Sequence, residues 1–592
     1  MKILATFFLT LLFIKPATAT SAEGGARSGA ATVTLQSFGA TANNPQINSR
    51  RAFQQALAAL ASQGGGTLHI PRGDYYLDFP DIANDLDPNE ASTRPVMAQS
   101  PLDKSKLIVI PTNVMIEGET DAAGSPVTRI HWKATSFPIF SLINSSHSGI
   151  KSISLVFDGT QPHFFTWRTE QYLAAMGINT KADPFYELSA VIYAYGAEGT
   201  LFENLTFASG AKHPDNEHTF AFGIVAKGKS PITQPGRDAT LRLPMGSQIP
   251  SGGLSELASG NTFRSLRFSD FVMGILASGQ YSPVFDNISG DNRGSWYRSF
   301  DPNHETGTSP THIGPPGHLI YITGQNTFNL VKSPQFPQGH DEIHSVMRNQ
   351  NLVIRNIKEG PHTYSNFNSL GTFALKFIEG GVIENVQSHH PSGLIVSMAD
   401  AHHLTLQNLT WSTDQDICSD PDSARNCHHP AIALIPQAGA GENGFNDYIT
   451  FKNVKLSSTR WASVIEVTSA HPPGPQNSHI DFEGLTIEST AKFHSGQTAP
   501  EGLITLQAVD STLSNVTYTP ILANISPQDK LNTAVVVRSG SSNVKVDVGI
   551  HNPVDHPDAY AQVRRTVVDE HQPGKESVGL NNRSVITSHE VK

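Results

Sequence analysis

The fold of this chain is decided by a stretch that reads Leu404-Thr405-Leu406-Gln407-Asn408-Leu409. Its last four residues follow a frame in which an apolar residue, a variable residue, Asn and a second apolar residue succeed one another. The frame occurs seven times, at residues 202–205, 285–288, 354–357, 383–386, 406–409, 451–454 and 513–516, and once with Gly in place of Asn at residues 482–485. Asn and Gly tolerate a left-handed backbone, so an extended strand can turn sharply there while the flanking apolar residues stay inside.

The spacing of the frames predicts a solenoid. From residue 356 onward the Asn or Gly positions are 29, 23, 45, 31 and 31 residues apart, which suits one coil per repeat, with two coils in the interval of 45. A β-sandwich or barrel also has alternating strands, but its turn signals come every ~8–12 residues. We therefore predict an all-β protein, a right-handed parallel β-helix. Its coils stack ~4.8 Å apart, so their outward side chains would form a long groove for a linear polymer.

The N-terminal region carries a family resemblance in three segments. These are Leu-Gln-Ser-Phe-Gly-Ala at 35–40, Ser-Arg-Arg-Ala-Phe-Gln-Gln-Ala-Leu at 49–57 and Gly-Gly-Gly-Thr-Leu-His-Ile-Pro-Arg-Gly-Asp-Tyr at 64–75. They resemble the start of pectate-lyase-superfamily proteins, which include rhamnogalacturonase-like enzymes, polysaccharide lyases, epimerase-like proteins and phage tailspikes. The paired-Asp signatures of polygalacturonase-type hydrolases are not evident. Apart from the family, Ala and Leu at helical spacing predict a capping helix over 49–62, ended by glycines before a strand at 67–70.

The first residues have the form of an export signal. Lys2 precedes an apolar run over residues 3–14, and the small residues Ala17-Thr18-Ala19 follow. This pattern predicts a signal peptide over 1–19 and a secreted or periplasmic mature chain. The run is too short to span a bilayer, which takes ~20 helical residues, and we expect no membrane span elsewhere. Residues 20–592 are expected to form one β-helix domain, with a cap at 31–80, groove-bearing coils at about 190–460 and C-terminal coils and tail at 461–592.

Composition and cysteine content narrow the function classes further. Charged residues are 16% of the chain, while 48 Gly and 38 Pro favour strands and turns. The formal net charge of −11 argues against nucleic acid as a partner. Cys418 and Cys427 are the two cysteines, and export permits a disulfide between them. A metal site is the alternative at this point because two histidines follow Cys427, but the spacing matches no recognised zinc site.

The region from about residue 286 to 403 is the richest in groups that move protons or bind anions. Elimination from a uronic-acid polymer needs a base, a cation or metal that neutralises the carboxylate, and an acid for the leaving oxygen. The candidate catalytic residues are His318, Tyr321, Arg293, Lys376 and His389, and the candidate substrate-binding residues are Trp296, Tyr297, Arg298, His340, His344 and His390. His318 ranks first, because two prolines and a glycine precede it and an apolar strand follows. Its imidazole, with a pKa near 6.5, would stand at a rigid edge.

Several interpretations of these residues stay open. Outward His and Lys side chains on a β-helix are often simply solvated, and alternation would put His318 and Tyr321 on opposite faces. Asp341 and Glu342 could bind a metal, although no EF-hand spacing surrounds them. The acids available for hydrolysis are Asp270, Asp286, Asp291, Asp341 and Glu342. The sequence establishes no cofactor and leaves Ca²⁺ open.

The predicted function is therefore that of a carbohydrate-active enzyme that cleaves an acidic polysaccharide. Export, the family resemblance and the central His, Arg and Tyr residues favour this function. A polysaccharide lyase acting by β-elimination ranks above a glycoside hydrolase on the same scaffold. The alternative from another class is a glycan-binding or surface-attachment protein without catalysis, because a fold does not fix a function.

Overall fold

The computed structural model describes the following parts of the chain. The described residues are 31–78, 108–132, 138–158, 190–209, 220–228, 257–269, 271–291, 318–333, 336–360, 371–389, 394–413, 430–435, 437–439, 442–458, 464–468, 476–490, 502–522, 531, 533–552, 563, 567–570 and 584–591. The signal segment, Cys418 and Cys427 lie outside them, so the predictions of export and of a disulfide stay predictions.

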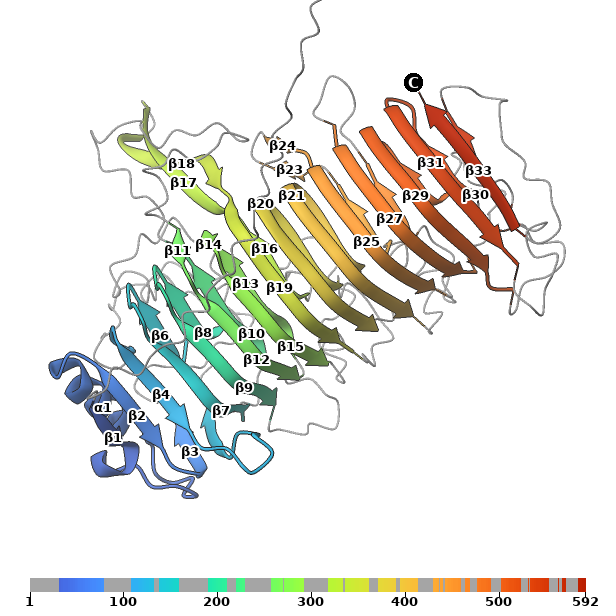
Figure 1. Ribbon diagram of the computed structural model, residues 1–592. Helices are drawn as coiled ribbons and strands as arrows, with labels where there is room; N and C mark the ends of the chain where they lie inside the picture. Colours follow the sequence, from blue (N-terminus) through green and yellow to red (C-terminus); the bar gives the residue numbers. More distant parts are fainter. Residues whose placement is uncertain are drawn as a thin grey trace, which may run out of the picture.

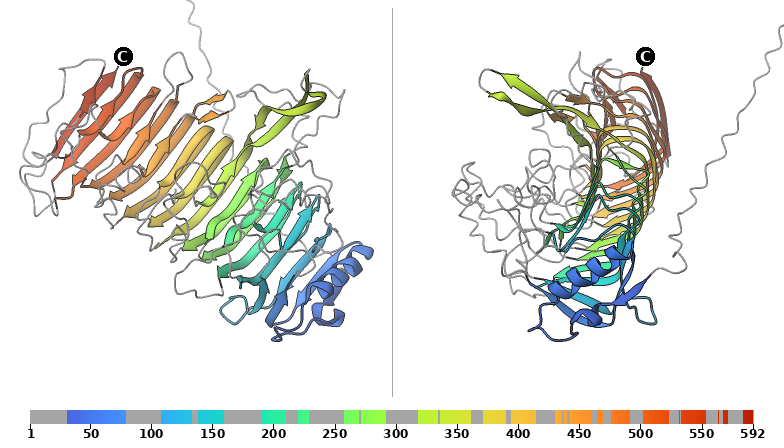
Figure 2. Two further views of the ribbon diagram at one scale, coloured as in Figure 1. Left: turned by 180° about the vertical axis from the view of Figure 1, so that it is seen from behind. Right: turned by 90° about the vertical axis from the view of Figure 1, so that its left-hand side faces the viewer.

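The described strands form a right-handed parallel β-helix, as predicted (Figure 1). Each coil passes through three stacks of parallel strands, and the outer surfaces of these stacks are called face 1, face 2 and face 3. Seen along the stack, the strands of successive coils overlie one another (Figure 2).

The first stack contains β6 (Phe140–Ile143), β8 (Ala190–Tyr195), β10 (Phe220–Lys227), β13 (Phe271–Ser278), β16 (His318–Thr323), the first parts of β20 (Gly371–His389) and β21 (Leu394–Thr413), β22 (Ile432–Leu434), β26 (Ile465–Val467), β28 (Gly502–Leu506), β30 (Thr533–Val537) and β32 (Val567–Asp569).

The second and third stacks are formed by longer strands that bend in the middle. They are β7 (Gly149–Phe157), β9 (Leu201–Ser209), β12 (Thr262–Ser269), β15 (Val284–Asp291), β19 (Asn349–Glu359), the later parts of β20 and β21, β25 (Asp447–Ser458), β27 (Ser478–Ser489), β29 (Val509–Pro520) and β31 (Ser542–His551).

Shorter strands complete the helix at its two ends and beside the stacks. At the N-terminal end, β1 (Thr32–Thr34), β2 (Gly66–Ile70) and β4 (Val114–Gly118) continue the second stack, and β3 (Gly73–Leu77) and β5 (Thr128–Trp132) continue the third. At the C-terminal end β33 (Ser584–Val591) pairs antiparallel with β31. The remaining strands are β11 (Ala258–Ser259), β14 (Gln280–Tyr281), β17 (Gln325–Ser333), β18 (Phe336–Met347), β23 (Gln437–Gly439) and β24 (Glu442–Gly444).

The repeated Asn marks the bend between the second and third stacks. All seven asparagines of the frame have φ between 53° and 58°, and Gly484 has φ 75°, so every one is left-handed. Side chains in successive coils are linked, for example from Asn408 Nδ2 to Asn385 Oδ1 at 3.1 Å and from Asn453 Nδ2 to Asn408 Oδ1 at 3.4 Å. The predicted role of the frame is therefore confirmed.

One detail of the predicted spacing is wrong. Asn408 and Asn453 are 45 residues apart, yet β21 pairs directly with β25 with Leu409 opposite Val454, so the interval is one coil and not two. The added length lies between the third stack of one coil and the second stack of the next. It includes a small antiparallel hairpin of β23 and β24. Strand pairing fixes the register, while the connection between strands is free to lengthen.

The interior is filled by apolar side chains that repeat from coil to coil. The rings of Phe263 and Phe285 stack with centroids 4.7 Å apart and planes at 4°, and those of Phe451 and Phe482 stack at 4.5 Å and 4°. All four side chains are fully buried. Offset or parallel ring contacts of this kind add to the stabilisation from burial, so like residues align in neighbouring coils.

The predicted N-terminal helix is present as α1 (Arg50–Ser62), which follows the short helix η1 (Leu35–Phe38). Its buried residues recur at helical spacing, and the Phe53 ring packs edge-on against Phe140 at 5.6 Å. The helix lies at the N-terminal end of the stack (Figure 1). Its role as a cap stays a prediction, as do the predicted domain boundaries. Among the described residues there is no helix with the length and apolar character needed to cross a membrane.

Candidate functional site

Faces 2 and 3 of the β-helix differ in the charge that they carry. The outward row of face 2 runs in register through Glu117, Lys151, Glu203, Arg264, Asp286, Arg355, Glu384, Gln407, Lys452 and Glu483. Charge alternates along this row apart from the single Gln. Neighbours pair, for example Lys151 with Glu117 at 2.9 Å and Lys452 with Glu483 at 3.1 Å. Face 2 therefore neutralises itself and offers little to a charged polymer.

Face 3 has a different outward row. It runs through Asp74, Arg129, Ser154, Thr206, Arg267, Ser289, Lys358, Gln387, Thr410, Lys455, Thr486 and Thr517. Hydroxyl, amide and cationic groups make up this row, and its one carboxylate, Asp74, is bound by Arg129 at 2.5 and 3.0 Å. The side chains of such a row could donate hydrogen bonds to a glycan and bind its acidic groups.

The part of face 3 on β19, β20 and β21 is the candidate site, and we call it the central patch. It consists of Lys358, Gln387, His389, Thr410 and Ser412, together with Gly360, which directly follows β19. Lys358, Gln387 and Thr410 are exposed, and His389 and Ser412 are half-buried. No carboxylate stands among these six positions. The next cations of the row on either side of the patch, Arg267 and Lys455, lie near Asp291 at 3.8 Å and Glu488 at 3.6 Å.

His389 is held in a defined orientation within the central patch. Its Nδ1 lies 2.9 Å from Ser412 Oγ on the next coil. On the preceding coil stands Gly360, where a Cβ would lie 3.2 Å from the Cβ of His389 and would also collide with the His389 carbonyl. A side chain is therefore excluded beside the imidazole on that side. His389 was a catalytic candidate from the sequence, and it is the candidate that the structure places on face 3.

His318, Tyr321 and Lys376 come together elsewhere, on the first stack. The His318 ring lies 5.7 Å from the Tyr321 ring, and Lys376 Nζ lies 5.4 Å from the centroid of Tyr321. Tyr321 stands between Leu276 and Ala374 of neighbouring strands. These three residues are thus one cluster, but they lie on a different stack from the central patch.

The environment of His318 contradicts the expected chemistry. Its side chain is buried, and its Nδ1 donates to the carbonyl of Gly371 at 3.0 Å. Burial lowers the pKa of the imidazole from 6.5 to about 3, and the charge of Lys376 acts in the same direction. The expectation that His318 presents an imidazole with a pKa near 6.5 at an edge is wrong, because the ring is buried and burial disfavours its charged form. A catalytic role for His318 stays an untested prediction without support from this geometry.

A second polar cluster lies at the N-terminal end of face 3, and sequence analysis missed it. His131 lies between two carboxylates, with Nε2 3.0 Å from Asp74 and Nδ1 2.8 Å from Asp158, and its ring stacks on Tyr76 at 4.8 Å. Burial lowers the pKa of His131, but hydrogen bonds to Asp158 and Asp74 outweigh this and raise it overall. The hydrogen bond from Arg129 is the main cause that holds the pKa of Asp74 at about 2. Alternation in residues 73–77 and 128–132 was the signal that could have paired these side chains.

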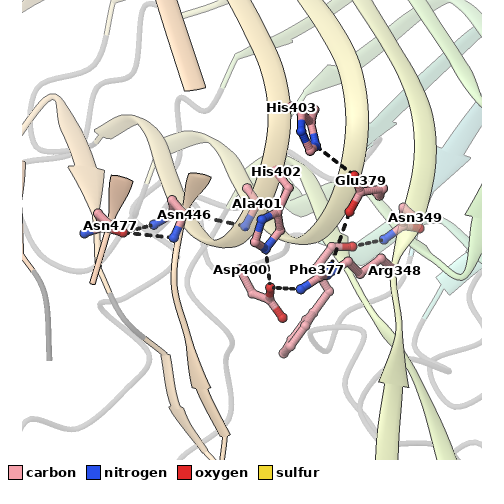
Figure 3. A network of polar contacts seen from close by, with 10 residues as sticks. All are labelled: Arg348, Asn349, Phe377, Glu379, Asp400, Ala401, His402, His403, Asn446 and Asn477. Atoms are coloured by element: carbon pink, nitrogen blue, oxygen red, sulfur yellow. Dashed lines mark hydrogen bonds and ion pairs between the residues drawn. The ribbon is translucent and has the colours of Figure 1, made fainter. Parts of the chain in front are cut away.

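A third cluster lies at the corner between faces 1 and 2 (Figure 3). Arg348 Nη2 donates to Asp400 Oδ1 at 2.6 Å, and His402 Nε2 lies 2.8 Å from the same oxygen. Arg348 also donates to Glu379 at 3.3 Å, and Glu379 accepts from His403 Nδ1 at 2.9 Å. Asp400 is only 2% exposed, whereas the His403 side chain is 58% exposed. The cluster thus compensates a buried carboxylate and leads from it to the surface.

The other predicted site residues are not brought together by the described structure. Arg293, Trp296, Tyr297, Arg298, His390 and Asp270 lie outside the described residues. The side chains of His340, His344, Asp341 and Glu342 are also not described, and their backbone lies in β18, which pairs with β17 in a hairpin that projects from the stack (Figure 1). Asp286 belongs to the face 2 row, where hydrogen bonds from Arg355 and Asn356 outweigh desolvation and lower its pKa. In the described ranges, no three His, Cys, Asp or Glu side chains group as metal ligands.

Comparison with known proteins gives similarities of shape at low sequence identity. No family model matches the chain, and no curated protein matches it. The A-module of a mannuronan C-5 epimerase of Azotobacter vinelandii is 12% identical over 82% of this chain and 99% of that chain, with a TM-score of 0.35. A surface adhesin of Streptococcus pneumoniae is 10% identical over 95% and 98%, with a TM-score of 0.43. A mutant tailspike protein of E. coli bacteriophage HK620, in complex with a pentasaccharide, is 10% identical over 88% and 81%, with a TM-score of 0.42. Similarities at this level do not bear on the function of this chain.

Proposed function

We propose that this protein is an exported member of the pectate-lyase superfamily that binds an acidic polysaccharide along face 3 and cleaves it by β-elimination at the central patch. The observation that carries the proposal is that an ammonium group and an imidazole stand on neighbouring strands of the central patch, whose six positions include no carboxylate. Lys358 and His389 stand on adjacent strands, because Lys358 is opposite Gln387 and His389 follows two residues later. Two strands ~4.8 Å apart and two residues of rise place them roughly 8 Å apart, within reach of one sugar unit.

The two side chains have complementary roles in this mechanism. The ammonium group of Lys358 binds the uronate carboxylate and so stabilises the negative charge that develops when the C5 proton leaves. His389 takes up that proton through its imidazole, oriented by the Ser412 hydroxyl. The electrons of the broken C–H bond form the C4–C5 double bond, and the C4–O bond breaks. The leaving oxygen then takes a proton from solvent or from an acid outside the central patch.

The shape of the patch also suits a linear substrate. Gln387 and Thr410 continue the row beyond Lys358, one per coil, with an amide and a hydroxyl that can hydrogen-bond sugar hydroxyls. An extended chain that follows the row would meet one such group every ~4.8 Å. The groove predicted along the coils stays a prediction.

The test is a digestion of uronic and sulfated polysaccharides by the purified full-length chain. Unsaturated products absorbing near ~230 nm are expected from elimination. His389→Gln should lower turnover by ~10²–10⁴, which is the usual cost of losing a general base, with unchanged binding of polymer. Lys358→Gln should weaken binding by roughly two- to fivefold, the equivalent of one exposed ion pair, and salt should weaken binding by the parent.

Lys452→Gln provides the matched control. Lys452 lies outside the central patch, on face 2, and is paired with Glu483, so its loss should leave polymer binding unchanged. New reducing ends without absorbance near ~230 nm would show that the chain cleaves by hydrolysis and not by elimination. If the chain binds the polymer but releases no product, it is a glycan-binding protein and the catalytic assignment ends. Full activity of His389→Gln would also end the catalytic assignment.

A further inference from the structure

We infer a second carbohydrate site on the corner between faces 1 and 2, formed by His403, Tyr448 and His479 and suited to a neutral oligosaccharide. It goes beyond the proposed function, because it lies at a different edge of the coil and uses different chemistry. The three residues stand on β21, β25 and β27, at the same position in three successive coils.

The backbone at this corner is left-handed in every coil of the series. From β14 to β31 the corner row comprises Ser282, Asn351, Gly380, His403, Tyr448, His479, Asp510 and Asn543, and each has φ between 50° and 77°. On the N-terminal side the row continues through glycines to a separate imidazole, that of His147, with φ 52°. Five of the eight are Ser, Asn, Gly or Asp, small residues of which Gly, Asn and Asp adopt this conformation readily. The three consecutive rings are the exception. A left-handed backbone is strained for most L-residues and accommodates His more readily than Tyr, so the turn itself does not explain why the Tyr448 ring occupies it.

The rings are held in a fixed and exposed array. The Tyr448 ring lies between the two imidazoles, with centroids 5.0 Å from His403 and 4.1 Å from His479, and with planes at 7° and 9°. The Nδ1 atom of His403 lies 2.9 Å from Glu379, and that of His479 lies 2.9 Å from Asp447. Tyr448 is 48% exposed and the His403 side chain 58%. Since Nδ1 of each imidazole is bound to a carboxylate, both rings take matching orientations and their Nε2 atoms lie on the other side.

The array has the chemistry of a sugar-binding edge. It offers a phenol hydroxyl flanked by two imidazole nitrogens, at the spacing of the coils, and all three hydrogen-bond with sugar hydroxyls. The rings are already ordered in the folded protein, so binding of a sugar does not carry the entropic cost of immobilising these side chains. Next to His403 the row continues with Gly380, which has no side chain, and a Cβ added there would be in ordinary contact with Asn351 Oδ1 at 3.6 Å.

Charge decides which sugars fit. The groups around the array are Glu379 and Asp447, which bind the imidazoles, and Asp510, which is the next residue in the row. The guanidinium of Arg348, which shares Glu379 with His403, is bound by Glu379 and Asp400. A uronate or sulfate would therefore meet carboxylates here, whereas neutral sugar hydroxyls can donate to them. This corner thus selects a neutral glycan, in contrast to the central patch.

The test uses a variant in which all three rings are replaced by Asn, namely His403→Asn, Tyr448→Asn and His479→Asn. Asn occupies the same row at Asn351 and Asn543, so it suits the backbone, and Glu379 and Asp447 keep Arg348 and Ser478 as partners. The probes are soluble glucan, galactan, mannan and xylan in affinity electrophoresis. The parent chain should be retarded by at least one, and the triple variant should lose at least tenfold in affinity with an unchanged melting temperature.

Ser282→Asn is the matched control, since it changes a residue of the same row three coils away from His403, and it should leave retardation intact. The inference is overturned if no neutral polymer retards the parent, or if the triple variant binds as the parent does while its melting temperature falls, which is the result expected of a purely structural stack. His389→Gln should bind the neutral polymer normally, and the triple variant should cleave acidic polymer normally. Failure of one site is therefore distinguishable from failure of the other.

Discussion

The clearest test of the fold concerns Asn408, whose left-handed backbone the sequence frame predicts. Asn408 has φ 57°, donates to Asn385 at 3.1 Å and accepts from Asn453 at 3.4 Å. Replacement by Ala removes both hydrogen bonds. Ala also lacks the polar side chain with which Asn stabilises a left-handed backbone. The bonds are exposed and contribute about 0.5 kcal/mol each, and the backbone costs about 1 kcal/mol more than with Asn, so Asn408→Ala should destabilise by roughly 2 kcal/mol.

Asn408→Gly separates the two contributions. Glycine adopts φ 57° without steric cost, so only the hydrogen bonds and some chain entropy are lost, and the expected destabilisation is about 1 kcal/mol. Urea unfolding of both variants, with the slope measured in each case, gives the comparison. If Gly costs as much as Ala, or if Ala is neutral, the left-handed turn is not what selects Asn in the frame, and the reasoning from the sequence fails.

Three further predictions concern the buried polar groups and the tightest turns. Burial lowers the pKa of His318 from 6.5 to about 3, so the neutral imidazole contributes its full stability above pH 6.5. As the pH falls toward 3, this stability is lost by up to about 1.4 kcal/mol per pH unit. The urea midpoint should therefore drop less between pH 7 and pH 5 in His318→Gln than in the parent chain. Gly371→Ala should lower the free energy of unfolding by about 2–5 kcal/mol, because φ is 127° and a Cβ there would collide with a main-chain carbonyl of the next coil. Gly380→Ala, with φ 77° and 3.6 Å to the nearest atom, should lower it by only about 1–2 kcal/mol. Thermal melting of the two variants gives the comparison. Arg348→Met leaves the buried carboxylate of Asp400 without its guanidinium partner and should lower the free energy of unfolding by about 3–5 kcal/mol. Adding Asp400→Asn to that variant should restore part of the loss. Equal stability of the single and double variants would contradict the pairing of Arg348 with Asp400.

Local pattern was enough to predict the architecture. Each Asn of the frame acts on its own backbone, and the alternation around Phe451 or Leu406 assigns side chains to the interior without knowledge of neighbours. The helix at residues 50–62 likewise depends on spacing within one turn of chain. The interval of 45 residues was misjudged because spacing along the chain does not say whether extra residues form a coil or lengthen a connection, and only the pairing of β21 with β25 decides this.

The site could be predicted only in part, because it depends on contacts between coils. His389 was named from the sequence, but its place beside Lys358 and Ser412 follows from the register of three strands. His318 was named with equal reason, yet the coil buries it and lowers its pKa to about 3. The sequence by itself therefore determined the fold, since left-handed turns and alternating apolar residues are local properties of the chain. Only the tertiary structure decided which polar residues meet, because residues up to about 70 positions apart become neighbours solely through the register of the stacked strands.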